Sequence, residues 1–248
     1  MSILSISLIS VLGISLVSFI GVILLVFRDE IINKILIVLV AFSAGTLMGG
    51  AFFHLLPETL KTNNKPLQIF SYLLIGFSCF FIIERILRWR HCHQRKCQTH
   101  PHLGYINLIG DGVHNAIDGI IIFSAFSVGP QLGIPIVLSI LFHEIPQEIG
   151  DFGVLLYSGF KKIKALFFNF ISALFSFAGV FLGFVLLNQT DKLINFLLPF
   201  AAGGFIYIAA SDLIPELHKE KEIPRSLISF ITFAVALILM LLAKIFTD

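Results

Sequence analysis

The sequence predicts an all-α membrane protein with eight transmembrane helices, arranged 3+2+3 with an inverted repeat of spans 1–3 and 6–8. Three observations predict this fold: an apolar composition, eight long apolar runs and an internal repeat. Of the 248 residues, 57% are hydrophobic and 13% are charged, and the mean hydropathy is +0.96. An ordinary soluble domain carries about 25% charged residues, so this chain has too few to cover a water-facing surface. We therefore expect a lipid bilayer around it, and the net charge of +2 indicates no nucleic-acid partner.

The apolar runs give the expected spans. A helix needs about 20 mostly apolar residues to cross a bilayer. The first run is expected to be a span and not a signal peptide, because no basic residue precedes it and no small-residue cleavage pattern follows it. We expect one polytopic membrane domain over residues 1–248, joined by short linkers. The expected spans are about 3–27, 35–57, 67–88, 104–128, 132–158, 164–188, 193–214 and 226–247.

The positive charges predict the orientation. Lys and Arg gather in cytoplasmic loops. Of the 17 Lys and Arg residues, 13 lie in the loops after spans 1, 3, 5 and 7. Only Lys61, Lys65, Lys192 and Lys244 lie on the other side. An integral multi-pass protein with both termini on the non-cytosolic side is therefore expected, and an odd number of spans would destroy this segregation.

An internal repeat links the second span to the seventh. AGTLMGGAFFHLLPE (44–58) and AGGFIYIAASDLIPE (202–216) match at six positions with a constant offset of 158. The two segments would cross the membrane in opposite directions, which is typical of inverted-repeat transporters. Chance similarity between small-residue packing motifs is the alternative, but both segments also end in Pro-Glu. We therefore predict that spans 4 and 5 lie between two repeats.

The fourth and fifth spans carry the polar side chains expected to do the chemistry. At 100° per residue, each span gathers four of them within an arc of about 100° on one helix face, and Glu148 lies some 40° beyond the second arc. An ionised group facing lipid costs about 2.5–3.5 kcal/mol, so these groups must face each other or water. The fourth span contributes Asp111, His114, Asn115 and Asp118, and the fifth contributes His143, Glu144, Gln147 and Asp151.

Imidazole, carboxylate and amide groups in one place suit a borderline divalent metal such as Zn²⁺. Pro146 lies within the second set and has no N–H, so it frees the carbonyl of Phe142 from the helix ladder. Broken helices are tolerated in membranes where they line a cavity. A simple kink is the alternative, but the position of Pro146 among the candidate ligands favours a water-accessible metal site.

HNAIDG in the fourth span and HEIPQEIGDF in the fifth resemble the signature helices of the ZIP (Zrt/Irt-like) family of metal transporters. The repeated segments resemble that family's second and seventh spans. The resemblance covers most of the chain. It implies eight spans, a homodimer and transport of divalent metal toward the cytosol, with Zn²⁺ as the foremost substrate and Fe²⁺, Mn²⁺ or Cd²⁺ as others.

The resemblance also implies a binuclear site between spans 4 and 5. The family more often has Glu or His at the position of Gln147, and often Glu at Asp118. Some members add a carboxylate in the sixth span, where Ser172 or Ser176 is nearest here. By position, one metal would be held by His114, Asp118, His143 and Gln147, and the second by Asn115 and Glu144 with Asp118 bridging.

Two other functions also fit part of this pattern. An intramembrane zinc metalloprotease would use His143 and Glu144, but such a motif needs a second His four residues on, where this chain has Gln147. A zinc exporter could use His114 and Asp118, but such exporters have fewer spans and a cytosolic domain, and we expect neither feature here. We therefore expect a transporter rather than an enzyme.

Further polar residues lie near the span ends. His54 and Asp212 occupy equivalent positions in the repeat and would line an access or exit path, or anchor the interface. Glu84 is expected to pair with Arg85 at the cytosolic end. The cytosolic loop 89–103 is dense in His and Cys, which suggests zinc handling, although a plain basic linker is an equal alternative.

Overall fold

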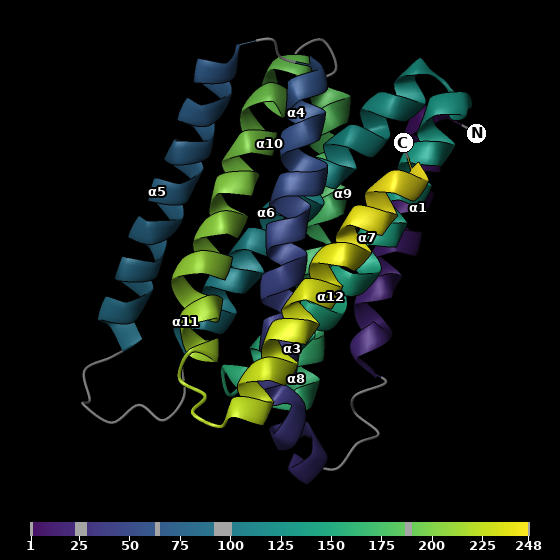
Figure 1. Cartoon of the computed structure of the whole chain (residues 1–248). Coiled ribbons are helices and arrows are strands. Elements are labelled where there is room, and N and C mark those ends of the chain that lie inside the picture. The colour runs from purple at the N-terminus through teal and green to yellow at the C-terminus, as the bar shows by residue number, and fades with distance from the viewer. Residues whose placement is uncertain (1, 23–28, 63–64, 92–100, 187–189, 248) are drawn as a thin grey trace.

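The structure, a computed structural model, describes residues 2–22, 29–62, 65–91, 101–186 and 190–247, and every regular element in these ranges is a helix. The helices follow one another in eight rods (Figure 1). Four rods contain an irregular segment or a break. These are α1 (Ile3–Ser15) with 3₁₀ helix η1 (Leu16–Gly21); α3 (Asp29–Gly49) with π-helix η2 (Gly50–Leu55) and α4 (Leu56–Thr62); α8 (Lys162–Ala173) with α9 (Phe175–Val185); and α10 (Thr190–Tyr207) with π-helix η4 (Ile208–Leu213) and α11 (Ile214–Leu217). The uninterrupted rods are α5 (Pro66–His91), α6 (Pro101–Val128), α7 (Pro130–Tyr157) and α12 (Ile223–Thr247).

Six segments among the described residues are long and apolar enough to cross a membrane, which confirms an integral multi-pass membrane protein. The rods α6 and α7 are not among these six, because they carry the ionisable side chains described below. Each has 28 residues, about 42 Å of helix, which exceeds the 30 Å hydrocarbon core. The expected span ends at 27 and 188, and most of the 89–103 loop, lie outside the described residues. The six segments that are long and apolar enough to cross a membrane are Ile3–Gly21, Ile35–Lys61, Pro66–Ile86, Lys162–Val185, Lys192–Leu217 and Ile223–Phe246.

The irregular segments recur at one spacing along the chain. The π-helix η2 begins at Gly50 and η4 begins at Ile208, 158 residues later. The same interval separates the break after α1 at Ser15 from the break after α8 at Ala173, and the Ser15 hydroxyl donates a hydrogen bond to the Ala173 carbonyl at 3.1 Å. Backbone irregularities therefore coincide with the offset of the sequence repeat.

Close helix contacts depend on glycines at equivalent repeat positions. Gly45 places α3 against α12, where a Cβ would lie 2.5 Å from the Phe233 carbonyl oxygen. Gly203 places α10 against α5, where a Cβ would lie 2.0 Å from the Leu73 carbonyl oxygen. Small residues allow this close approach of helix backbones in membranes. Many large apolar side chains on α5 and α12 remain exposed, as contact with lipid would require.

The rods α6 and α7 form a hairpin that runs through the middle of the bundle. Gly129 alone connects them, with a φ of +156° that side chains disfavour. Pro130 follows at the first helical position, where a backbone N–H would have no partner within the helix, so the missing N–H of proline costs nothing. This short connection places the polar faces of α6 and α7 side by side, which positions the candidate site.

Candidate metal site

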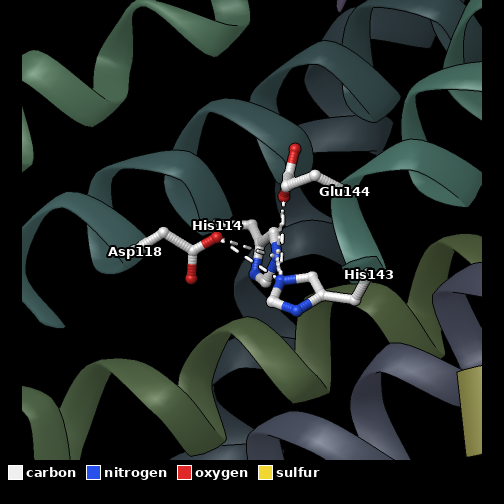
Figure 2. A group of neighbouring side chains, drawn as sticks. All are labelled: His114, Asp118, His143 and Glu144. Carbon is white, nitrogen blue, oxygen red and sulfur yellow. Dashed lines mark hydrogen bonds and ion pairs between the residues drawn. The ribbon is translucent and has the colours of Figure 1, made fainter. Parts of the chain in front are cut away.

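Four ionisable side chains of the α6–α7 hairpin converge on one point (Figure 2). His114 and Asp118 come from α6, four residues apart and therefore on one face. His143 and Glu144 come from the facing side of α7. All four are at most 5% exposed. The structure thus brings together four of the residues that the sequence predicted as metal ligands.

Five distances between potential ligand atoms in this group are close to those found around a single ion. The Nε2 atom of His114 lies 3.3 Å from His143 Nε2, 3.5 Å from Asp118 Oδ2 and 3.3 Å from Glu144 Oε1. His143 Nε2 lies 3.5 Å and 3.8 Å from the same two oxygens. Ligand atoms that share a tetrahedral Zn²⁺ at 2.0–2.1 Å are about 3.3–3.4 Å apart. These five spacings therefore suit a zinc-sized ion.

Hydrogen bonding prepares His143 to act as a ligand. Its Nδ1 lies 3.1 Å from the carbonyl oxygen of Ser139, one turn earlier in α7. A carbonyl only accepts, so Nδ1 carries the proton and the Nε2 lone pair points at the cluster. Such a second hydrogen bond orients most metal-binding histidines and selects their tautomer.

The carboxylate atoms that face the cluster lack other partners. Asp118 Oδ2 and Glu144 Oε1 are buried and accept no hydrogen bond from any residue that the structure describes. Two carboxylates with two neutral imidazoles carry a charge of −2, and isolated buried charge is costly. A divalent cation would neutralise this charge and satisfy both oxygens.

Gln147 lies one turn beyond His143 on α7 and is also buried. Neither its amide oxygen nor its amide nitrogen has a hydrogen-bond partner among the described residues. It fits against π-helix η2 only because Gly50 has no side chain, since a Cβ there would lie 2.8 Å from Gln147 Nε2. An orphaned amide at this place is compatible with its predicted role as a ligand.

Asn115 is engaged differently. Its amide nitrogen donates to the backbone carbonyl of Asp111 at 3.1 Å and to that residue's carboxylate at 2.8 Å. The binuclear grouping of Asn115 and Glu144 around a second metal remains a prediction. In the structure, Glu144 faces the two histidines instead.

A second polar layer follows toward the start of α6. Each of its three carboxylates receives a hydrogen bond from a neighbouring side chain: Asp111 from Ser172, Glu148 from Asn169, and Asp151 from Asn107 at 2.9 Å. Asn107 and Asn169 were missed by the sequence reasoning. Their only signal was an amide within an apolar run, which does not identify its partner.

On the other side of the cluster, a small cavity is lined by three of its residues, His114, Asp118 and His143. It has a volume of about 70 Å³ and extends from Asp118 past His54 to Glu58 and Lys244. His54 lies in η2, with its ring 4.8 Å from that of His143 and its Nε2 3.1 Å from the Met240 carbonyl oxygen. His54 therefore adjoins the site, whereas Asp212 lies in a separate cluster.

The comparisons with known proteins were consistent with one another. The profile of the ZIP zinc transporter family matches residues 1–102 and 88–244. The zinc transporter zipt-7.1 of Caenorhabditis briggsae is 29% identical over 245 residues, covering 75% of this chain and 62% of that protein. The yeast zinc transporter YKE4 is 28% identical over 230 residues (81% and 66%), and human zinc transporter ZIP13 is 26% identical over 266 residues (85% and 71%).

The matched region thus spans about two thirds of the length of these relatives. The family profile nevertheless matches nearly the whole of this chain, including the α6–α7 hairpin. The chain therefore belongs to the ZIP zinc transporter family.

Proposed function

We propose that this chain carries divalent metal, foremost Zn²⁺, through the membrane toward the cytosol by way of the α6–α7 hairpin. The observation that carries the proposal is the buried group of His114, Asp118, His143 and Glu144, whose potential ligand atoms all lie within 4.8 Å of one another. A transported cation needs ligands that replace its water shell and still release it. Mixed imidazole and carboxylate ligands meet this need for zinc.

Transport is favoured over catalysis by the residues around the cluster. A zinc protease of the His-Glu-x-x-His type needs a second His where this chain has Gln147. The relatives are named zinc transporters, which supports a carrier rather than an enzyme. The implied homodimer and the transport of Fe²⁺, Mn²⁺ or Cd²⁺ remain predictions from the resemblance.

We also infer that each of the eight rods is one membrane span and that the first three and last three spans form an inverted repeat. The 158-residue offset relates the sequence segments, the two π-helices and the two helix breaks. In this arrangement α6 and α7 cross the membrane despite their polarity, because their charged faces are buried by the surrounding rods. The cavity past His54 then leads to the non-cytosolic side, and the layer from Asp111 to Asp151 leads to the cytosolic side.

The orientation is tested by cysteine labelling in a background without the three native cysteines. Lys162→Cys should react with a membrane-impermeant maleimide only when the cytosolic face is accessible, and Lys65→Cys only from the opposite face. The reason is the excess of positive charge in the loops after the odd-numbered spans. Both positions have side chains at least partly accessible in the structure, so labelling in permeabilised membranes serves as the positive control. Exchanged accessibility would contradict the orientation.

Function is tested by metal uptake into liposomes that contain the purified protein. We expect saturable Zn²⁺ uptake that depends on protein, with competition from Cd²⁺ and weaker competition from Mn²⁺, because imidazole ligands favour softer ions. A trapped fluorescent zinc indicator reports the initial rate, and oriented vesicles reveal the preferred direction. Protein-free rates at all zinc concentrations would contradict transport, and movement only away from the cytosolic side would indicate an exporter.

A further inference from the structure

We propose that Lys244 controls the entry of cations at the mouth of the cavity that His54 lines. The Lys244 ammonium group occupies the carboxylate of Glu58, and an incoming divalent cation displaces it. Lys244 lies in the last turn of α12, at the non-cytosolic end of the predicted topology. The inference rests on the proposed transport function and names a residue that determines which cations enter and how readily.

The ion pair and the metal cluster share one cavity. This cavity of about 70 Å³ is lined by Glu58 and Lys244 as well as by three residues of the cluster. The Glu58 side chain is 39% exposed, whereas the cluster residues are at most 5% exposed. Glu58 therefore marks the solvent-facing end. Outside the cluster, Glu58 and Lys244 are the only charged side chains among the described residues that line the cavity, and the others are mainly aliphatic: Leu55, Ile121, Ile136, Ile140 and Leu198.

The contact between the two charged groups is loose. Lys244 Nζ lies 3.9 Å from Glu58 Oε2, which is longer than a direct N–H···O hydrogen bond of about 2.7–3.2 Å. An ion pair that is partly open to water contributes little binding energy. The Lys244 side chain is only 15% exposed, so its charge lies against the apolar wall, where water screens it less. The ammonium group is thus near enough to offset the carboxylate charge and free enough to be displaced.

Helix α12 places Lys244 along the route to the metal cluster. The carbonyl end of a helix favours a positive charge in its last turn, which is the position of Lys244. One turn earlier, the Met240 carbonyl oxygen lies 3.1 Å from His54 Nε2. Residues four apart share a helix face, so the same face of α12 meets both His54 and Glu58. The C-terminal end of α12 and helix α4 lie toward the same end of the bundle (Figure 1).

A tethered ammonium group discriminates between cations by their charge. Lys244 already supplies Glu58 with one positive charge, so exchange for Na⁺ or K⁺ brings little gain. A divalent ion attracts the same carboxylate about twice as strongly at the same distance, so it displaces the ammonium group. The need for displacement slows entry. Charges at the rim of a binding site act mainly on association rate and on its salt dependence, so the effect of Lys244 should appear there.

The test compares Lys244→Gln with Lys61→Gln in zinc uptake by vesicles that have the C-terminal end of α12 outside. Lys61 is the matched control because its Nζ lies 3.5 Å from the same Glu58 oxygen. Its side chain is 54% exposed, and Lys61 is not one of the described residues that line the cavity. At low salt, Lys244→Gln should lower the half-saturating zinc concentration at least about 3-fold. Lys61→Gln should change it less than about 2-fold, since exposed charges are screened.

Two further comparisons test the exchange at Glu58 itself. KCl should inhibit Lys244→Gln more than an equal concentration of choline chloride, because K⁺ fits beside the vacated carboxylate and choline is too large. The two salts should act alike on the unsubstituted chain. Glu58→Gln should remove most of the gain from Lys244→Gln, since the two substitutions act on one interaction. Lys244→Arg keeps the positive charge and should show no gain.

Unchanged zinc kinetics in Lys244→Gln, or an equal gain in Lys61→Gln, would overturn the role of Lys244. A full gain in the double variant with Glu58→Gln would also overturn it, because the carboxylate would then play no part. A misfolded variant cannot imitate the expected result, since misfolding lowers uptake and the prediction is a gain at low zinc. Failure of the proposed transport function would appear differently, as protein-free rates in the unsubstituted chain.

Discussion

Asp118→Ala and His143→Ala are each expected to reduce zinc uptake by at least about 100-fold, close to the rate of protein-free liposomes. Each substitution removes one of the four clustered side chains, and the loss of a side chain that only hydrogen-bonds to a metal ligand already costs about 10–100-fold in metal affinity or activity. Asp118 also supplies half of the negative charge that balances a divalent ion in a buried site, where electrostatic terms are large. The loss should therefore appear in the maximal rate and in the half-saturating concentration.

Gln147→Ala provides the graded comparison. The amide of Gln147 offers only a neutral oxygen, which is a weaker ligand for zinc than imidazole or carboxylate. Removal of this amide should therefore mainly raise the half-saturating zinc concentration. Gln147→His should bind zinc more tightly and favour it over Mn²⁺, with slower release. Initial rates are compared after correction for the amount of reconstituted protein, and a monodisperse elution profile shows that each variant is folded.

Asp118→Asn separates charge from shape at the same position, because the amide keeps the size of the carboxylate. We expect it to be nearly as inactive as Asp118→Ala. Normal transport by Asp118→Ala would show that the transported metal does not bind at this cluster. Equal losses for Gln147→Ala and Asp118→Ala would show that the ranking of ligands is wrong.

Gly119→Ala is expected to have a large effect on the fold. This glycine lies where α6 crosses α9, and a Cβ there would be 2.0 Å from the Ser176 carbonyl oxygen and 2.9 Å from Val180 N. Both neighbours are backbone atoms, so the helices must separate. Gly179 opposes it with a comparable contact to the Ala116 carbonyl oxygen, at 1.9 Å. Overpacking costs about 1–3 kcal/mol, which corresponds to a fall in Tm of about 2–12 °C for a chain of this length.

Gly112→Ala is the matched control, because it makes the same substitution seven residues earlier in α6. A Cβ at Gly112 would meet only the Phe175 ring at 3.6 Å, an ordinary contact. Thermal unfolding in detergent should therefore separate the two variants clearly. Zinc uptake should also fall in Gly119→Ala, since displacement of α6 moves the adjacent Asp118. Equal melting temperatures for the two variants would contradict the close α6–α9 contact.

Local patterns in the sequence identified much of the first site. Helical periodicity places His114 and Asp118 on one face of α6, because residues four apart are neighbours on any helix. The cost of charge in lipid then requires the polar faces of α6 and α7 to meet. The repeat was likewise visible as a constant offset, which the π-helices and breaks later matched. These features depend on spacing along one chain segment, which a sequence displays directly.

Which polar atoms come close to one another depended on the tertiary structure. Periodicity could not decide whether Glu144 or Gln147 completes the group, because helix rotation and rotamers are set by packing, here by Gly50 opposite Gln147. Periodicity also does not reveal that the Asn115 amide donates to the carboxylate of Asp111 one turn earlier.

The sequence by itself determined a membrane-embedded helical protein of the ZIP family with a polar α6–α7 pair. Only the tertiary structure decided the meeting of Glu84, His102 and Asp212. These residues lie on three different rods, and a contact between distant segments follows from how the whole bundle packs rather than from any local pattern.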